Sequence, residues 1–473
     1  MREHPFSEDR EEMKELLAQF ELLKNGRSHS FIEEDAFIKL IEYFDEKEDN
    51  ANALEAATLS VEQFPYSSAL FLKKADILIG IRKYKEALLL LEQAELLDRN
   101  DINLYILKTD VYLALDQQQK AVEILEEGLV LFSGEERIDL LFELADVYDD
   151  YEDFEKVFDC LQIILEQDPA NEEALYKICF WTDFTGRNEE SIRLHLKIID
   201  IQPYNELAWF NLASSYQGLK LYEKAVDAYL YAIAIDDKFD YAYRNLGDAY
   251  IRLRKYKDAI EALSRVLELS KPEEVIYEAI GHCYDKMHNY AQARFYYRKA
   301  THLNPEIGKL FYKIAYTYFN EQQWIPALKQ LATAVKIHPK QPEYYLLMGE
   351  CYLVLNKIKE AVQNFSISVT LRPKNIAGWE ALIRCLYKAS FYEEAEEQVI
   401  AALRITKGNT LFLFYQAAIL FGFGKSKEAL MTLEKAMERA PRLLKKFIAL
   451  NPSIFQNQQV VDIIARHKRM KKF

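Results

Sequence analysis

The sequence predicts an all-α fold built from a repeated unit, and two observations carry that prediction. The 473 residues include only 14 glycines and 12 prolines, against 31 tyrosines and 27 phenylalanines. Few turn-forming residues and many large aromatic ones favour packed helices. The second observation is a residue pattern that returns every 34 positions. At ~150 residues per domain, this length fits about three domains or one extended array.

The repeated pattern is clearest between residues 209 and 373. An aromatic residue opens each unit, at Trp209, Tyr243, Tyr277, Phe311 and Tyr345. An alanine recurs further along each unit, at Ala225, Ala259, Ala293, Ala327 and Ala361. Several units close on a proline, at Pro305, Pro339 and Pro373. Because small side chains let helices approach closely and proline stops helix propagation, each unit is predicted to be a helix–turn–helix hairpin.

This pattern resembles the tetratricopeptide repeat, whose signature places an aromatic residue, Leu-Gly, Tyr, Ala, Phe, Ala and Pro at these spacings. The same frame continues in both directions and gives twelve repeats over residues 34–443, with one two-residue slip near residues 133–136. The resemblance implies a right-handed α-solenoid superhelix whose first helices line a concave groove. Since no unit can bury its apolar face alone, such an array is stable only by stacking.

Helical caps are predicted at both ends of the array. Residues 1–33 should form the N-terminal cap, with a helix over residues 8–24 that begins after Ser7 and ends before Asn25 and Gly26. One face of this helix carries the apolar residues Met13, Leu16, Leu17 and Phe20. At the other end, residues 444–473 should form a C-terminal capping helix followed by a basic tail. Cations at a helix C-terminus complement its dipole, so this tail is predicted to be a solvated end.

Composition and charge narrow the classes of function. The net charge of −15 divides into −26 over residues 1–200 and +11 over residues 201–473. An acidic protein repels phosphate backbones, which disfavours nucleic acid as the main partner. The longest apolar stretch, residues 411–423, is interrupted by Gln416 and is shorter than the ~18 residues of a membrane span. No secretion signal opens the chain and the five cysteines are scattered, so a cytoplasmic protein with reduced thiols is predicted.

The sequence predicts no catalytic site, no cofactor and no metal site. The acidic run at residues 146–155 lacks the glycine and the ligand order of a calcium loop, and His282 and His288 lack further ligands at metal spacing. His195 occupies an aromatic core slot and is predicted to pack there. No Gly-rich phosphate loop or nucleophile elbow is present. Because repeats and caps account for the whole sequence, no separate catalytic domain remains, and the protein is not expected to be an enzyme.

Two groups of first-helix residues are predicted to face a partner. The first group is acidic and consists of Asp35, Glu42, Asp45, Asp76, Asp110, Asp139, Asp146, Asp149 and Asp183. The second group is mostly aromatic and consists of Tyr176, Phe180, Phe210, Tyr241, Arg244, Tyr312, Tyr316, Phe319 and Leu346. Exposed aromatic rings favour recognition, although some could instead pack on a neighbouring helix. Asn211 and Asn245 share one repeated slot and are predicted to contact a partner's backbone.

These residues predict a non-catalytic scaffold or adaptor that holds protein or peptide partners in the groove. The partner should carry a basic segment for the acidic half and apolar or aromatic anchors for the other half. The alternative is a regulatory sensor that binds a small ligand or peptide at the aromatic stretch. The Lys and Asn clamp of chaperone-binding relatives is not expected, because its slots carry Ile38, Glu42, Leu72 and Asp76. RNA binding by the basic half remains a third, weaker interpretation, since base-reading residue pairs are missing.

Overall fold

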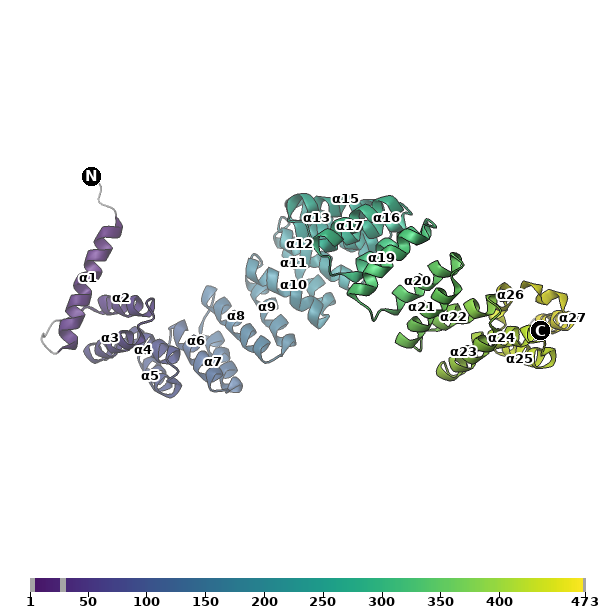
Figure 1. Cartoon of the computed structure of the whole chain (residues 1–473). Coiled ribbons are helices and arrows are strands. Elements are labelled where there is room, and N and C mark those ends of the chain that lie inside the picture. Colours follow the sequence, from purple (N-terminus) through teal and green to yellow (C-terminus); the bar gives the residue numbers. More distant parts are fainter. Residues whose placement is uncertain (1–4, 26–30, 471–473) are drawn as a thin grey trace. The chain divides into compact units, whose positions relative to one another are not determined.

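The computed structural model describes residues 5–25 and 31–470, and every regular element in this part of the chain is a helix (Figure 1). The all-α solenoid class predicted from the repeat is therefore confirmed. The chain forms two compact units, Met1–Asp237 and Lys238–Phe473. The net charge is −29 over the first unit and +14 over the second.

The first unit holds one leading helix, α1 (Pro5–Lys24), and six helix pairs. The pairs are α2 (Glu34–Asp45) with α3 (Asn50–Gln63), α4 (Ser68–Gly80) with α5 (Tyr84–Leu97), α6 (Ile102–Ala114) with α7 (Gln118–Leu131), α8 (Glu135–Asp150) with α9 (Phe154–Gln167), α10 (Glu172–Thr185) with α11 (Asn188–Ile201), and α12 (Glu206–Gly218) with α13 (Tyr222–Ile235). Most of these first helices begin 34 residues after the previous one, as the repeat predicts.

The second unit holds six further pairs and a C-terminal group of short helices. The pairs are α14 (Asp240–Arg252) with α15 (Tyr256–Leu269), α16 (Glu274–Lys286) with α17 (Tyr290–Leu303), α18 (Gly308–Asn320) with α19 (Trp324–Ile337), α20 (Pro342–Val354) with α21 (Ile358–Leu371), α22 (Ile376–Lys388) with α23 (Tyr392–Ile405), and α24 (Thr410–Gly422) with α25 (Ser426–Arg439). The C-terminal group comprises η1 (Pro441–Leu443), α26 (Leu444–Leu450), η2 (Pro452–Gln456) and α27 (Gln458–Met470).

The turn inside each pair has one left-handed residue at the same place. These twelve residues have φ between 56° and 75° and are Glu48, Arg82, Asp116, Glu152, Gly186, Lys220, Arg254, His288, Gln322, Asn356, Ser390 and Gly424. In a representative turn, the Leu221 N–H donates to the Tyr216 carbonyl oxygen at 2.8 Å, and the Lys220 N–H donates to that of Gln217 at 2.8 Å. Such bonds occupy carbonyl groups that the end of the first helix leaves without intrahelical partners.

Small residues set the close approach of the two helices within a pair. A Cβ added at Gly247 would lie 2.7 Å from Leu263, and one added at Gly281 would lie 2.7 Å from Tyr297. Ala259, on α15, is fully buried. A larger side chain at these positions would therefore force the helices apart, which is the reason the sequence pattern suggests for glycine and alanine there.

The slip in the repeat frame is absorbed by α8 and not by a longer loop. This helix has 16 residues, whereas α6 has 13. The buried residues Leu141 and Tyr148 lie 36 positions after Tyr105 and Tyr112, so the additional residues form an extra turn at the N-terminus of α8. Arg137 in this turn donates from Nη1 to the Leu129 carbonyl oxygen at 2.6 Å. That bond joins the extra turn to the preceding helix α7.

Each end of the chain covers an apolar surface within its own unit. Phe20 of α1 is fully buried in a cluster with Phe37 and Phe44 of α2. Phe447 of α26 and Val460 of α27 are buried in a cluster that includes residues of α24 and α25. The predicted start of the first helix at residue 8 is three residues late, since α1 begins at Pro5. No helix in the described residues is both long and apolar enough to cross a membrane.

Candidate functional site

All nine predicted carboxylates of the first unit lie on exposed side chains of the first helices. Four residues form a repeated series, one in each of the helices α2, α4, α6 and α8, at intervals of 34, 34 and 36 positions. We call this series the acidic row, and it consists of Glu42, Asp76, Asp110 and Asp146. The repeat places them at equivalent positions because each follows the same number of residues after the core slots of its helix.

The acidic row is only partly compensated by cations. Lys73 Nζ lies 2.7 Å from a Glu42 oxygen, and Lys177 Nζ lies 3.8 Å from an Asp146 oxygen. Asp76 and Asp110 form no ion pair with any described residue. Partial burial raises the pKa of Asp76, and the nearby Asp45 raises it further. Partial burial also raises the pKa of Asp110, with a contribution from Asp76. Lys73 acts in the opposite direction on Asp76 and lowers its pKa. The two middle carboxylates lack ion pairs and form a region of negative charge that this one lysine offsets only in part.

Glu143 belongs to the same region, although the sequence analysis did not select it. Burial raises the pKa of Glu143, and the charges of Asp110, Asp146 and Asp139 raise it further. This residue is three positions before Asp146 on α8, so helical spacing alone could have assigned it to the same side of the helix. It was missed because only the repeated acidic slots were considered.

An apolar hollow lies beside the acidic row. Its volume is about 210 Å³, and the polar residues Lys73, Asp76, Asp101 and Asn103 line it together with apolar residues. Ile38, Leu72 and Ile106 occupy the same slot in three successive first helices and form the apolar part of the lining. The acidic row and the apolar surface of this hollow are thus adjacent in the first unit. The sequence analysis used Ile38 and Leu72 only to exclude a chaperone clamp and did not identify them as a surface.

The predicted role of Asn211 is wrong. Its side chain is only 2% exposed and donates from Nδ2 to the Leu175 carbonyl oxygen at 2.7 Å. The amide therefore ties α12 to α10 and cannot reach a partner's backbone without breaking that bond. Asn245, in the same slot of α14, is half-buried, and its predicted contact stays a prediction.

The aromatic residues of the first unit divide into two environments. Tyr176 and Phe180 are 62% and 60% exposed, whereas Phe210 is half-buried and its ring centroid lies 5.7 Å from that of the buried Tyr229. Phe180 also contacts Trp181 and Phe184, with centroid separations of 4.9 and 6.0 Å. Phe184 is as exposed as Phe180 and was not predicted. The surface here is broader than the sequence indicated.

The predicted aromatic residues of the second unit lean on neighbouring rings. The Tyr312 ring stacks on the buried Tyr344 at 5.3 Å, and the Phe319 ring meets Trp324 edge-on at 5.1 Å. Both side chains are half-buried, whereas Tyr316 between them is 42% exposed. The packing alternative thus applies to Tyr312 and Phe319, and Tyr316 remains the accessible ring of this group.

The remaining predicted residues of this group have mixed surroundings. Tyr241 is 62% exposed, with the Arg244 guanidinium 6.0 Å from its ring centroid. Arg244 also forms an ion pair with Glu273 at 2.5 Å. Leu346 is half-buried against the C-terminal hydrophobic cluster. Of these three residues, only Tyr241 presents a largely exposed apolar surface.

The described residues show no ready-made reactive group. The five cysteines are free, and burial raises the pKa of Cys160, Cys283 and Cys351 to about 12, which disfavours their thiolates. His195 is fully buried, as its core slot predicts. Within residues 5–25 and 31–470, no three His, Cys, Asp or Glu side chains gather in a way that could hold a metal ion.

A part of the repeated helix pairs matches a known family model in sequence. The model of the tetratricopeptide repeat protein 21 C-terminal ARM domain matches residues 208–346. This match covers 139 of the 473 residues and is to a family of tetratricopeptide repeat proteins. No curated protein matches this repeat protein over its sequence.

Solved structures of other repeat proteins are similar at low sequence identity. The C-terminal part of a TPR repeat-containing protein from Cytophaga hutchinsonii is 16% identical, with 54% of this chain and 99% of that chain covered and a TM-score of 0.44. The Cut9–Hcn1 hetero-tetramer of the APC/C is 15% identical, with 82% and 90% covered and a TM-score of 0.37. YrrB, described as a TPR protein with an unusual peptide-binding site, is 19% identical, with 40% and 96% covered and a TM-score of 0.35.

Proposed function

We propose that this tetratricopeptide-type protein is a non-catalytic scaffold or adaptor of the cytoplasm, which binds a basic, amphipathic segment of a partner protein at the acidic row. The observation that carries the proposal is the pair Asp76 and Asp110, which lack ion pairs, beside the apolar hollow at Ile38, Leu72 and Ile106. A partner helix with lysine or arginine on one side and leucine on the next would satisfy both surfaces.

Electrostatics supports this choice of partner. The pKa values of Asp76 and Asp110 are raised mainly by partial burial and then by a neighbouring carboxylate, so a cation that arrives favours their charged forms and relieves the repulsion between neighbours. The first unit carries a net charge of −29, which should also steer a basic segment toward it. Such an encounter weakens at high salt, since charges are screened over ~8 Å at physiological ionic strength. Binding at this surface should accordingly depend strongly on salt.

A labelled peptide tests the proposal directly. The probe is a fluorescein-labelled helical peptide with lysines and leucines on adjoining faces, and its affinity for the full chain is measured by fluorescence anisotropy. We expect Asp76→Asn with Asp110→Asn to weaken binding about tenfold, since exposed ion pairs contribute ~0.2–1 kcal/mol each. The matched control is Glu92→Gln with Glu126→Gln, which removes two exposed charges from the second helices α5 and α7.

The result that contradicts the proposal is equally specific. An equal loss of affinity in the control pair would mean that the peptide senses only the net charge of the unit. Affinity that is the same at low and high salt would exclude the acidic row as the binding surface. In either case the carboxylates would be a solvated face with no recognition role.

A second candidate function is supported by exposed rings. Phe180 and Phe184 are 60% and 58% exposed and stack within a cluster that also contains Trp181 and Phe154. Exposed aromatic clusters commonly bind apolar ligands or partners. A regulatory sensor would bind a small ligand or peptide here, and titration calorimetry of the full chain with and without Phe180→Ser would distinguish such a ligand from a protein partner by its size and stoichiometry.

A further inference from the structure

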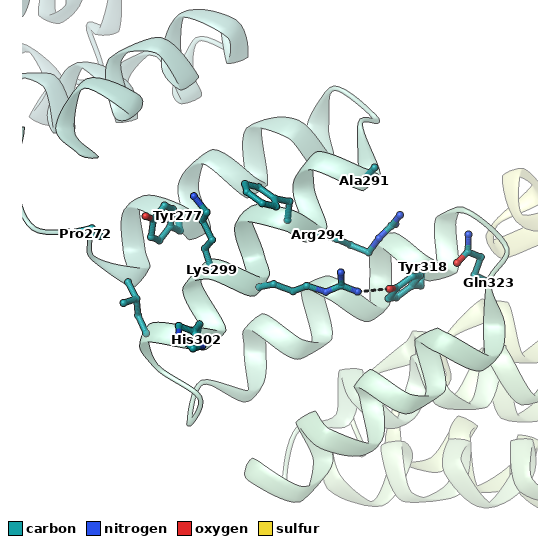
Figure 2. A pocket seen from close by; sticks show the side chains of 11 residues that line it. Pro272, Tyr277, Ala291, Arg294, Lys299, His302, Tyr318 and Gln323 are labelled. Atoms are coloured by element: carbon teal, nitrogen blue, oxygen red, sulfur yellow. Dashed lines mark hydrogen bonds between the residues drawn. The ribbon is translucent and has the colours of Figure 1, made fainter. Parts of the chain in front are cut away.

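A pocket of the second unit lies along the second helix α17. Its volume is about 750 Å³. Figure 2 shows that its walls come from Tyr277 of α16, from side chains along α17 and from Tyr318 of α18. The core side of α17 carries Ala293 and Tyr297, whereas Phe295 lies about half a turn and Arg298 about a third of a turn away from that side. The pocket is therefore on the outer side of α17.

The pocket is lined by cations and by no acidic residue. Arg294 is compensated, because its guanidinium forms an ion pair with Glu321 at 2.7 Å. Arg298 and Lys299 are exposed and form no ion pair with any described residue. His302, one turn beyond Arg298, adds a further nitrogen-bearing side chain to the lining. Two cations without ion pairs and an imidazole thus lie on one surface, and the carboxylate of Glu321 beside them is occupied by Arg294.

Aromatic rings hold both cations in place. The Arg298 Nη2 donates to the Tyr318 hydroxyl at 2.6 Å, as the dashed line in Figure 2 marks. The Lys299 ammonium lies 5.2 Å from the ring centroid of Tyr277 and 4.8 Å from that of Phe295. Cation–π contacts and hydrogen bonds of this kind restrict long side chains before a ligand arrives. Restricting them in advance lowers the entropy cost of binding.

Comparison of the pocket-lining residues with those 34 positions earlier and later shows which of them helix packing requires. Tyr277 and Tyr318 occupy slots that are aromatic in the neighbouring repeats as well, as at Tyr243, Phe311, Tyr284 and Tyr352. Phe295 and Arg298 occupy slots that vary, filled 34 residues earlier and later by Glu261, Lys329, Ser264 and Ala332. Helix packing therefore does not demand them. The Phe295 side chain is nevertheless 49% exposed, so a large apolar ring is partly in contact with water, which is unfavourable. The neighbouring repeats form the same helix with charged residues, Glu261 and Lys329, in this slot.

The spacing of the cations along α17 indicates the form of the ligand. Arg298 and His302 are four residues apart, which corresponds to a rise of about 6 Å along the helix. Alternate side chains of an extended peptide lie on one face about 6.6 Å apart. Carboxylates at alternate positions of an extended peptide can therefore face successive turns of α17. A third side chain on the same face, two positions further on, would lie over Phe295.

We propose that this pocket binds an extended acidic segment of a partner protein. Two alternate Asp or Glu side chains contact Arg298, Lys299 and His302, and an aromatic side chain two positions further along packs on Phe295. This site is independent of the acidic row, since it lies in the other unit, carries the opposite charge and takes the opposite kind of segment. Charge complementarity selects acidic over basic peptides, and the ring of Phe295 selects an aromatic residue at the third position.

The probe is a fluorescein-labelled peptide that contains Glu-Ser-Glu-Ser-Trp between flexible ends, and the comparison peptide has Gln in place of both Glu residues. Anisotropy with the full chain should show at least tenfold weaker binding of the Gln peptide. Arg298→Gln with Lys299→Gln should weaken binding of the Glu peptide by about tenfold, because contacts between charged groups are lost. The matched control is Lys329→Gln with Lys336→Gln, two exposed cations of the next second helix, α19, which should change affinity less than twofold.

Three results would overturn the proposal. The first is equal binding of the Glu and Gln peptides to the unaltered chain, and the second is an equal loss in the control pair. The third is a higher affinity for inorganic triphosphate than for the Glu peptide, with the same dependence on Arg298, which would make the pocket a phosphate site. Thermal unfolding of each variant checks the fold. Phe295→Ala should reduce the preference for Trp over Ser in the peptide and leave the preference for Glu over Gln intact.

Discussion

Asn211 of α12 donates a hydrogen bond of 2.7 Å from its Nδ2 to the carbonyl oxygen of Leu175 in α10. Both groups are buried between the first helices of consecutive repeats. We expect Asn211→Ala to destabilise this part of the first unit by about 1–3 kcal/mol, the range for leaving a buried polar group unpaired. Hydrogen exchange should accelerate in α10 and α12, while affinity for the basic peptide at the acidic row stays unchanged. Asn245→Ala is the control, and an equal effect there would contradict this account.

Asp110 should destabilise the first unit at neutral pH. Its pKa is raised in the folded chain, mainly by partial burial and then by Asp76. A raised pKa means that the folded state holds a proton more tightly than the unfolded state, so protonation of Asp110 stabilises the fold. This stabilisation is fully present below the unfolded pKa of 3.8 and is lost as the pH rises through the folded pKa. Asp110→Asn should therefore stabilise the unit at pH 7, by less than about 1 kcal/mol because more than a third of the side chain remains exposed to screening solvent.

Urea denaturation at several pH values measures the effect of Asp110→Asn. The stability of the variant should also depend less on pH just above 3.8 than that of the unaltered chain. Glu123→Gln, an exposed carboxylate on α7, is the control and should change little. A variant that is less stable at pH 7 would show that Asp110 makes a favourable contact in the folded state.

His195 should make the first unit sensitive to acid. Its Nδ1 donates to the Ser191 carbonyl oxygen at 2.7 Å, while its buried Nε2 has no partner among the described residues. Burial lowers the pKa of His195 to about 4, so the folded chain resists a proton that the unfolded chain accepts at about 6.5. This contribution to stability is fully present above pH 6.5 and is lost as the pH falls toward 4. The free energy of unfolding should decrease by roughly 3 kcal/mol over this range.

His195→Leu should remove this acid sensitivity, because leucine fills the same slot at Leu263 and Leu331 without titrating. Circular dichroism melts between pH 4 and 7 provide the measurement, with His338→Gln as an exposed control. Should the leucine variant lose as much stability as the unaltered chain between pH 6.5 and 4, other groups would be responsible.

Tyr312 and Tyr316 should differ in what they contribute. The Tyr312 ring is half-buried and stacks on Tyr344, whereas Tyr316 is 42% exposed. We expect Tyr312→Ala to destabilise the second unit by about 3 kcal/mol, the lower end for truncating a packed aromatic side chain, and Tyr316→Ala by less than about 1 kcal/mol. Chemical denaturation measures both. A larger loss for Tyr316→Ala would make it a structural residue and would remove it as a partner anchor.

The helices could be predicted because the same 34-residue pattern of aromatic, alanine and proline slots recurs twelve times. A slot that is ambiguous in one repeat could be assigned from the others. The exposure of the carboxylates followed from the same period, since equivalent slots face equivalent directions. The role of Asn211 could not be predicted, because its acceptor is a backbone atom of a neighbouring helix. Whether Tyr312 leans on Tyr344 also depends on side-chain rotation, which periodicity does not determine. The pocket on α17 escaped notice because only first-helix residues were compared.

The left-handed residue that recurs in all twelve turns also makes the helix pairs exchangeable. Gln322 and Asn356 have φ of 61° and 59° at equivalent points of adjacent repeats. Excising residues 323–356 would join Gln322 to Lys357, so that α18 would be followed by α21 through a turn of unaltered geometry. A protein that is one repeat shorter would therefore need no new loop, because the existing turn would be kept. Gene duplication or deletion in steps of 34 codons would alter its reach while preserving each hairpin.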